Sequence, residues 1–216
     1  MSGAESRLRI ALTKGRLQDK SVELFEAMGL DCAPIRHPGR RLVHAIPNYP
    51  LDAVLAKAPD VITYVEHGVC DLGVVGKDTI LEKGGAFYEV LDLGFGRCRF
   101  ALAVKKGSDF YGTYKTRRIA SKYPNVTRTF FEGKGMDVDI IKIEGSVELA
   151  PILDLADGIV DIVETGATLK ENGLEPIEDV HQVSARLIVN TASMKLYKSE
   201  ITDFLFRVEG ELEGRA

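Results

Sequence analysis

The chemically most informative segment of the chain is a turn rich in threonine and glycine that follows an apolar run. The run GIVDIV, residues 158–163, is typical of a buried strand, and the turn follows at residues 164–168. Gly166 permits a tight turn, consecutive backbone N–H groups can converge on an anion, and the hydroxyls of Thr165 and Thr168 add donors where the next helix begins. The pattern predicts a phosphate-binding loop. The alternative is an ordinary strand–turn–helix connection with a threonine cap.

Two carboxylates accompany this loop. Asp161 lies on the predicted strand, and Glu164 lies where the strand ends, so its side chain can turn inward. Carboxylates beside a phosphate loop suit ribose hydroxyls or a bound Mg²⁺. Asp161 and Glu164 are therefore candidates for either role.

Further charged residues follow other predicted strands and turns. Lys14 and Arg16 directly follow a strand-like run, and Arg40 and Arg41 follow a Pro-Gly turn. Arginine binds phosphate through two parallel hydrogen bonds and lysine as a point charge, so these residues predict phosphate contacts. A solvated basic turn is the alternative. Asp78 also lies at a strand end, where a surface capping role is the alternative.

The elements that must position these residues alternate along the chain. Apolar runs typical of strands occupy residues 8–13, 71–75, 100–104, 117–121, 138–143, 158–163 and 187–190, and helical patterns occupy residues 18–28, 59–68, 125–131 and 192–208. This alternation predicts the α/β fold class. Ligands of parallel α/β sheets bind at the carboxyl ends of strands, where the candidate loops lie. Pro151 predicts that the helix in its amphipathic stretch begins late or is kinked.

The elements form two sets with no linker rich in proline, glycine or serine between them. We expect two lobes joined by strand crossovers, with an active-site cleft between them. Lobe I comprises residues 1–97 and 184–216, and lobe II comprises residues 98–183 with the phosphate loop. The strand at residues 187–190 is expected to return to the first sheet.

Composition narrows the functional class. The 216 residues include 28 Lys and Arg against 32 Asp and Glu, a net charge of −4, which argues against a dedicated nucleic-acid-binding domain. Residues 1–6 lack an apolar signal core, and no apolar stretch reaches the ~18 residues of a membrane helix, so we expect a cytoplasmic protein without membrane contact.

Cysteine and histidine usage predicts no metal site. The three cysteines are far apart without C-x-x-C spacing, which predicts buried free thiols. The four histidines show no ligand spacing and are expected to be exposed or hydrogen-bonded. The motifs of P-loop kinases, Rossmann dehydrogenases and nucleophilic serine hydrolases are also missing from the sequence.

The sequence around the loop resembles the signature of the ATP phosphoribosyltransferase family. The matching segments, which together extend over nearly the whole chain, are residues 13–17, 40–42, 64–68, 71–78, 144–151, 161–169 and 184–190. The resemblance implies two α/β lobes like a type II periplasmic binding protein. It also implies transfer of phosphoribosyl from phosphoribosyl pyrophosphate (PRPP) to N1 of ATP, with release of pyrophosphate and with substrate-bound Mg²⁺, as the first step of histidine biosynthesis.

The resemblance also assigns roles to residues. It implies that the PRPP-binding residues are Asp161, Glu164, Thr165, Gly166, Ala167 and Thr168, with the loop on the 5-phosphate and Glu164 or Asp161 on the ribose hydroxyls. It implies that the ATP-binding residues are Lys14, Gly15, Arg16, Arg41 and Asp78. Arg16 and Arg40 would be catalytic, because they would orient ATP and neutralise the departing pyrophosphate. Adenine N1 carries no proton to remove, so electrostatic stabilisation rather than a general base is expected.

The long form of this family continues into a regulatory domain that binds histidine, whereas this chain ends directly after its last predicted helix. We therefore expect the short form, a homodimer that works with a regulatory subunit resembling histidyl-tRNA synthetase in a hetero-octamer. Two alternatives stay open. One is a cytoplasmic small-ligand-binding protein of the same fold, and the other is a phosphoribosyltransferase with another acceptor base.

Overall fold

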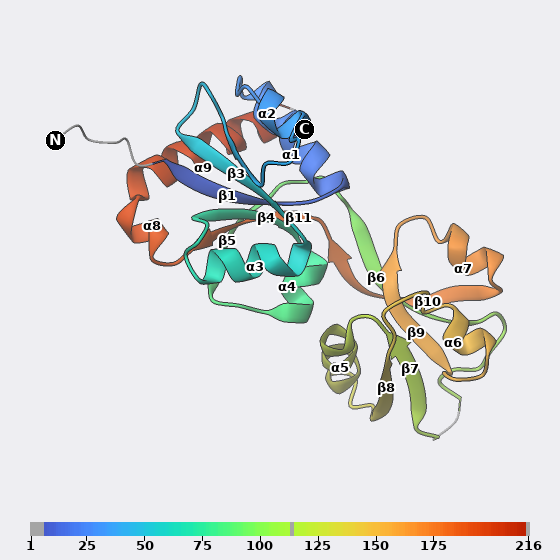
Figure 1. Cartoon of the computed structure of the whole chain (residues 1–216). Coiled ribbons are helices and arrows are strands. Elements are labelled where there is room, and N and C mark those ends of the chain that lie inside the picture. The colour runs from blue at the N-terminus through green and yellow to red at the C-terminus, as the bar shows by residue number, and fades with distance from the viewer. Residues whose placement is uncertain (1–6, 113–114, 215–216) are drawn as a thin grey trace. The chain divides into compact units, whose positions relative to one another are not determined.

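The computed structural model describes residues 7–112 and 115–214, which divide into two compact units. Unit 1 comprises Met1–Gly96 and Ser184–Ala216, and unit 2 comprises Arg97–Val183. Each unit has its own sheet (Figure 1). The predicted polar N-terminal segment, residues 1–6, and the chain end at residues 215–216 lie outside the described residues.

The sheet of unit 1 places three parallel strands side by side. Its order is β2 (Val43–Ala45), β3 (Leu51–Ala56), β1 (Leu8–Thr13), β4 (Leu72–Gly76), β11 (Ala185–Asn190) and β5 (Phe87–Asp92). β1 runs parallel to β3 and β4, whereas β2 and β11 run antiparallel to their neighbours. The carboxyl ends of β3, β1 and β4 therefore share one edge. The prediction that the strand near residue 187 returns to the first sheet is confirmed.

Helices cover both faces of this sheet, and the strand sequences explain why. Ile10 and Leu12 belong to an apolar cluster with residues of α1 (Arg16–Ala27) and α9 (Lys198–Glu213). In this cluster the rings of Phe25 and Phe204 pack edge to face, with their centroids 5.8 Å apart. Ala11 belongs to a second cluster with α3 (Ala58–Glu66). Because successive strand residues face opposite sides, both faces of β1 must be apolar. The shorter helices of unit 1 are α2 (Ala33–Arg36), α4 (Lys77–Lys83) and α8 (Ser193–Leu196).

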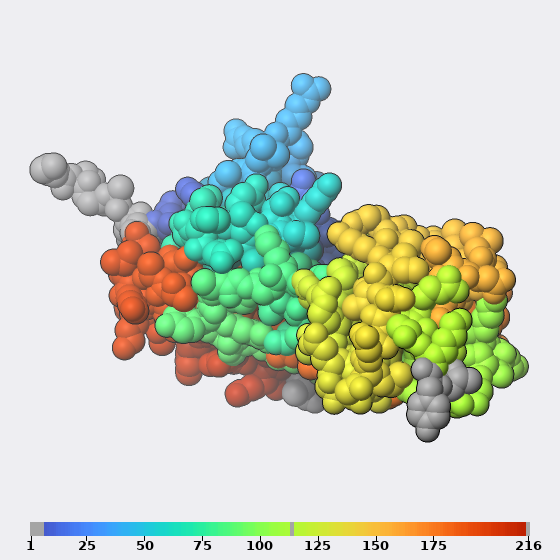
Figure 2. All heavy atoms as spheres, turned by 90° about the horizontal axis from the view of Figure 1, so that it is seen from below, coloured from blue at the N-terminus to red at the C-terminus, as the bar shows by residue number. Residues whose placement is uncertain are grey.

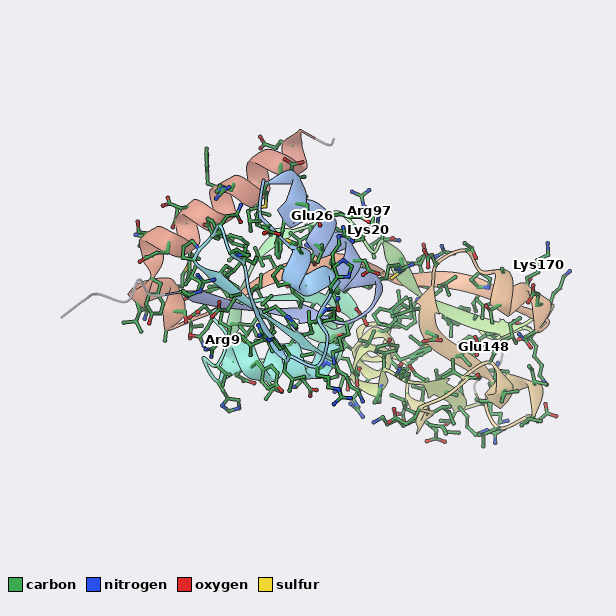
Figure 3. The ribbon with its side chains drawn as sticks, turned by 45° about the horizontal axis from the view of Figure 1, so that its top comes forward. Arg9, Lys20, Glu26, Arg97, Glu148 and Lys170 are labelled. Atoms are coloured by element: carbon green, nitrogen blue, oxygen red, sulfur yellow. The ribbon has the colours of Figure 1, made fainter. Side chains whose placement is uncertain are left out.

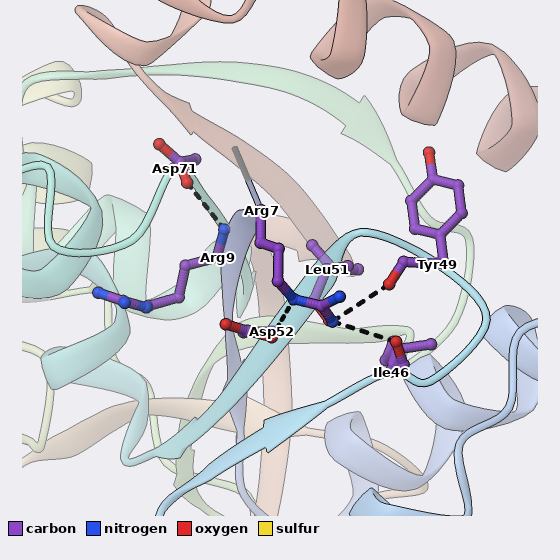
Figure 4. Close-up of polar contacts among 7 residues, drawn as sticks. All are labelled: Arg7, Arg9, Ile46, Tyr49, Leu51, Asp52 and Asp71. Atoms are coloured by element: carbon purple, nitrogen blue, oxygen red, sulfur yellow. Dashed lines mark hydrogen bonds and ion pairs between the residues drawn. The ribbon is translucent and has the colours of Figure 1, made fainter. Parts of the chain in front are cut away.

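Arg7 fastens the β2–β3 hairpin to the start of β1. Its guanidinium donates to Asp52 Oδ1 at 2.8 Å and to the backbone oxygens of Ile46, Tyr49 and Leu51 (Figure 4). These contacts satisfy carbonyl groups of an irregular turn that contains two prolines. The hairpin that follows the Arg40–Arg41 segment is thus held to the sheet.

Unit 2 contains a five-stranded sheet with β9 in the middle. The order is β10 (Leu174–Val183), β6 (Cys98–Lys105), β9 (Gly158–Val163), β7 (Arg117–Ser121) and β8 (Val138–Lys142). β9 runs antiparallel to β6 and parallel to β7. The helices of this unit are α5 (Pro124–Gly133), α6 (Leu149–Ile152) and α7 (Ala167–Glu171).

Two helices bear on details of the sequence prediction: the late start predicted for the helix with Pro151 is confirmed, and the single helix predicted at residues 192–208 is wrong. α6 begins late, at Leu149, and has Pro151 in its first turn, where a missing N–H costs no helical hydrogen bond. The segment predicted as one helix at residues 192–208 forms α8 and α9, which are separated at Tyr197. Of the helices in residues 7–112 and 115–214, none has the length and apolar content needed to cross a membrane.

Candidate active site

The predicted phosphate loop is a compact turn at the end of β9. Gly166 has φ of +77°, a left-handed conformation that favours glycine. The Ala167 N–H donates to Thr165 Oγ1 at 3.3 Å, and the Lys170 N–H donates to Gly166 O at 3.1 Å. The helix begins at Ala167, inside the predicted loop, because the left-handed glycine already directs the chain into the helical turn. α7 has only 5 residues.

This turn lines a pocket of about 310 Å³ in unit 2. All the residues predicted to bind PRPP line it, namely Asp161, Glu164, Thr165, Gly166, Ala167 and Thr168. The structure therefore brings together one complete set of predicted site residues. The hydroxyls of Thr165 and Thr168 are on exposed residues, and the carboxyl of Asp161 is on a partly buried one.

Glu148 also lines this pocket and was not predicted as a site residue. It comes from the segment just before α6, and Figure 3 labels it. Its position next to the loop depends on how that segment packs on β9, which spacing along the chain does not reveal. Its place within residues 144–151, one of the segments that resemble the family, was the available signal.

The environment of Asp161 favours its neutral form. Burial raises the pKa of the Asp161 carboxyl to about 6, and the negative charge of Glu148 adds to this rise. The Ile162 N–H and the charge of Lys122 oppose it. Hydroxyl groups that donate to the carboxylate would stabilise the ionised form. Asp161 is therefore an acceptor whose charge depends on its ligand near neutral pH.

The residues predicted to bind ATP belong to unit 1. Lys14 follows β1, and Asp78 lies in the first turn of α4 after β4, so both lie at the edge where the parallel strands end. Gly15 has φ of +89° and precedes α1, which makes Arg16 the first helical residue with an exposed side chain. Lys57 follows β3 at the same edge. Lys57 was missed because β3 was not predicted, although the pattern LDAVLA was the available signal.

Arg40 and Arg41 line a second pocket, of about 530 Å³. Both precede β2, which runs antiparallel to β3. They therefore lie near the same edge of the sheet as Lys14. Of the described residues predicted to bind ATP, only Arg41 lines this pocket, together with the catalytic candidate Arg40. The structure thus groups the two arginines but does not bring Lys14, Arg16 or Asp78 into the same pocket.

The predictions for the cysteines and histidines are wrong for one residue of each type. Cys32 and Cys70 are buried free thiols as predicted, but Cys98 is only half-buried because it begins β6 where the chain enters unit 2. His44 was expected to be exposed or hydrogen-bonded. It is 3% exposed, and its Nε2 has no hydrogen-bond partner among the described residues.

The described residues contain no group of three or more His, Cys, Asp or Glu side chains that could hold a metal ion. Three carboxylates line the pocket of the phosphate loop, those of Glu148, Asp161 and Glu164. Carboxylate oxygens are the donors that Mg²⁺ prefers, usually in company with substrate phosphates and water.

Comparisons with known proteins identify the family. The family model described as ATP phosphoribosyltransferase matches residues 57–210. An ATP phosphoribosyltransferase of Clostridium kluyveri is 57% identical over 208 residues, which are 96% of this chain and 95% of that relative.

Comparison with solved structures supports the same family. A chain of the ATP phosphoribosyl transferase (HisG:HisZ) complex from Thermotoga maritima matches with a TM-score of 0.81 and 33% identity over 96% of this chain and 99% of that chain. The periplasmic aliphatic sulphonate binding protein SsuA from Escherichia coli matches with a TM-score of 0.62 at 14% identity, over 97% of this chain and 73% of that chain. The second match concerns the fold alone, and it confirms the predicted likeness to a periplasmic binding protein. By sequence and by structure, this chain belongs to the ATP phosphoribosyltransferase family.

Proposed function

We propose that the pocket at the end of β9 binds PRPP, the phosphoribosyl donor of the reaction that defines this family. That reaction is the first step of histidine biosynthesis. It forms a bond between N1 of ATP and C1 of the ribose and breaks the bond from C1 to pyrophosphate. The observation that carries the proposal is that every residue assigned to PRPP lines one pocket.

The loop is suited to the 5-phosphate of PRPP. Because Thr165 Oγ1 accepts the Ala167 N–H, the hydroxyl proton of Thr165 remains available to donate to a phosphate oxygen. Thr168 offers a second exposed hydroxyl from the first turn of α7. Gly166 keeps a side chain away from the point where the phosphate approaches. Together they bind the phosphate through neutral donors.

The carboxylates are suited to the sugar. We assign the ribose hydroxyls to Asp161, with Glu164 beside it. Hydroxyl donors would lower the raised pKa of Asp161, so binding of the ribose and ionisation of this carboxyl favour each other. The exposed carboxylate of Glu164 would hold the waters of a Mg²⁺ ion bound to PRPP. When bound, the metal neutralises charge on the pyrophosphate.

Unit 1 supplies the cations for the second polyanion. We assign ATP to Lys14, Gly15, Arg16, Arg41 and Asp78, and we assign the departing pyrophosphate to Arg16 and Arg40. The transition state carries a cationic ribosyl carbon and an anionic leaving group, so fixed positive charges near the leaving group lower the barrier. No side chain has to remove a proton from adenine N1 before it attacks.

The solved relative from Thermotoga maritima forms a complex of HisG and HisZ. We propose that homodimers of this chain likewise assemble with a regulatory subunit that resembles histidyl-tRNA synthetase, in a hetero-octamer. Because PRPP and ATP are cytoplasmic metabolites, we place the enzyme in the cytoplasm.

The assignment of PRPP to the loop is tested by equilibrium binding. Thr165→Val and Thr168→Val remove a hydroxyl each, and we expect PRPP affinity to fall about tenfold per variant, because hydrogen bonds to charged groups are strong. Thr202→Val, on an exposed position of α9, is the matched control and should bind PRPP like the wild type. Unchanged PRPP affinity in both loop variants would contradict the assignment. Binding of PRPP without any phosphoribosyl-ATP in mass spectra would favour the small-ligand-binding alternative.

A further inference from the structure

Three neighbouring strands of unit 2 end at the edge of the sheet where the phosphate loop lies. β8, β7 and β9 run parallel, so their carboxyl ends meet at this edge. Lys122 directly follows β7, whose last residue, Ser121, pairs with Val160 of β9. The residue after Val160 is Asp161, so Lys122 and Asp161 come next in the same register. The strand pairing therefore places a cation beside a carboxylate of the pocket at the end of β9.

The charge of that pocket is one-sided. Among the described residues that line it are three carboxylates, those of Glu148, Asp161 and Glu164, and no lysine or arginine. The phosphate loop offers neutral donors only. PRPP is a polyanion with a 5-phosphate and a pyrophosphate, and like charges at close range repel each other. Binding of PRPP at this pocket therefore calls for a cation close to the lining.

Lys122 is a cation without a partner at this edge. In the part of the chain that the structure describes, its ammonium group has no ion pair or hydrogen bond, whereas Lys142, the last residue of β8, pairs with Glu144 at 2.7 Å. The charge of Lys122 opposes the rise of the Asp161 pKa and lowers the pKa of Glu144, so the ammonium group lies near both carboxylates. Lys122 is exposed, and the yellow part of the chain that follows it, with α5 and β8, lies at the surface of unit 2 in Figure 2.

We infer that Lys122 binds the pyrophosphate group of PRPP. This inference deepens the proposed function and rests on it. The 5-phosphate has the donors of the loop and the ribose hydroxyls have Asp161, so the pyrophosphate is the group of PRPP that still lacks a partner in unit 2. Lysine binds phosphate groups as a point charge on a flexible stem, which suits a group that departs during the reaction. Lys122 is thus a binding residue outside the contiguous loop.

Equilibrium binding of two ligands tests this contact. Ribose 5-phosphate contains the groups assigned to the loop and to Asp161, and PRPP adds the pyrophosphate. We expect Lys122→Gln to weaken binding of PRPP with Mg²⁺ about tenfold and to leave the affinity for ribose 5-phosphate within about twofold, because only PRPP loses a charged contact. Lys122→Arg keeps the charge and should retain most of the PRPP affinity. Wild-type PRPP affinity in Lys122→Gln overturns the inference.

Two controls separate this contact from indirect effects. At about pH 8.5 Asp161, with a pKa of about 6, is ionised with or without the charge of Lys122, so a change in its protonation does not contribute to the measured affinities. Lys106→Gln removes an exposed charge just after β6, at the opposite edge of the sheet, and should bind both ligands like the wild type. Equal losses of affinity for PRPP and ribose 5-phosphate in Lys122→Gln would overturn the assignment to the pyrophosphate. Because Lys122 and Lys106 are exposed, all variants should keep the wild-type melting temperature.

Failure of this inference differs from failure of the proposed function. If the wild type forms phosphoribosyl-ATP and Lys122→Gln binds PRPP as tightly as the wild type does, the proposed function stands and the inference fails. If the wild type binds no PRPP, both fail.

Discussion

Asp161 shares its pocket with Glu148, and the negative charge of Glu148 opposes the ionisation of the Asp161 carboxyl. Burial contributes most to the raised pKa of Asp161, about 6, and Glu148 adds to it. At neutral pH the ligand-free protein therefore holds a carboxylate that its surroundings disfavour. A ligand whose hydroxyl groups donate to this carboxylate would stabilise its ionised form. The buried carboxylate thus lowers the stability of the ligand-free protein and favours binding of such a ligand.

The pH dependence of PRPP binding follows from this arrangement. As the pH falls through about 6, Asp161 takes up a proton and loses its strength as an acceptor, so PRPP affinity should fall. PRPP's own phosphate titrates in the same range, with a pKa of about 6, and Asp161→Asn separates the two effects. We expect the affinity of the wild type to fall more steeply between about pH 7.5 and pH 5 than that of Asp161→Asn. Equal slopes in isothermal titration calorimetry would contradict the role of Asp161.

Asp161→Asn should also stabilise the ligand-free protein at pH 7. The folded pKa of Asp161, about 6, lies above the ordinary value of 3.8, so the folding penalty appears as the pH rises between these values and is complete at pH 7. A shift of about two pKa units corresponds to at most roughly 3 kcal/mol. Asp139→Asn, on an exposed position of β8, is the control and should change the free energy of unfolding by less than about 0.5 kcal/mol. The free energy of unfolding is measured by urea denaturation. A value for Asp161→Asn no higher than that for Asp139→Asn would contradict a raised pKa of Asp161 in the folded protein.

Alanine variants of two glycines next to α7 distinguish the effect of backbone strain on stability from the effect of a lost ligand contact. Gly166 and Gly173 have φ of +77° and +70°, and a Cβ at either position meets no atom closer than 3.7 Å. Replacement by alanine should cost about 1 kcal/mol of stability in each case, because the left-handed conformation disfavours a Cβ. Only Gly166→Ala should also weaken PRPP binding, since Gly173 lies after the helix and outside the pocket lining. Similar PRPP affinities for the two variants would show that the Gly166 turn does not bind the phosphate.

Arginine variants test the electrostatic account of catalysis. Arg16→Ala and Arg40→Ala should each lower kcat by ~10² to 10³, the usual loss when one preorganised donor is removed. Arg36→Ala, which removes an exposed ion pair with Glu26, is the control and should leave kcat unchanged. Circular dichroism checks that all three proteins fold. Wild-type turnover in both Arg16→Ala and Arg40→Ala would remove these residues from the mechanism.

Thiol reactivity should distinguish the cysteines. Burial raises the pKa of both Cys32 and Cys70 to about 11, so at pH 8 these thiols are protonated as well as inaccessible. Cys98 is half-buried. We expect a thiol reagent to modify Cys98 first in the folded protein and all three cysteines after denaturation. Rapid modification of Cys70 in the native protein would contradict the structure of unit 1.

The strands that the sequence predicts best are those with a short apolar run that the structure buries. The predicted boundaries at residues 8–13, 117–121 and 158–163 coincide with β1, β7 and β9, because each strand contains a short buried apolar run. β10 was missed because exposed polar residues and Pro176 interrupt its pattern. β2 was missed because it has only 3 residues.

The candidate site contains residues that a local sequence pattern predicts and residues that only the three-dimensional packing brings to the site. The loop residues Thr165 to Thr168 are contiguous, so their pattern alone indicates a phosphate turn. The positions of Glu148 and Lys57 depend on how other elements pack. The buried His44 Nε2 has no hydrogen-bond partner among the described residues, which only the structure can show. Such relations depend on strand order and register, which the spacing of residues along the chain does not specify.

The central claim is tested most directly by pyrophosphate release from the purified chain supplied with Mg²⁺ and PRPP and either ATP or GTP, with and without the regulatory subunit. We predict release with ATP only, because N1 of adenine is an unprotonated nucleophile whereas N1 of guanine carries a proton. Release with both nucleotides would contradict the predicted selectivity for ATP over GTP. No release with either, even with the regulatory subunit present, would contradict the phosphoribosyltransferase reaction itself.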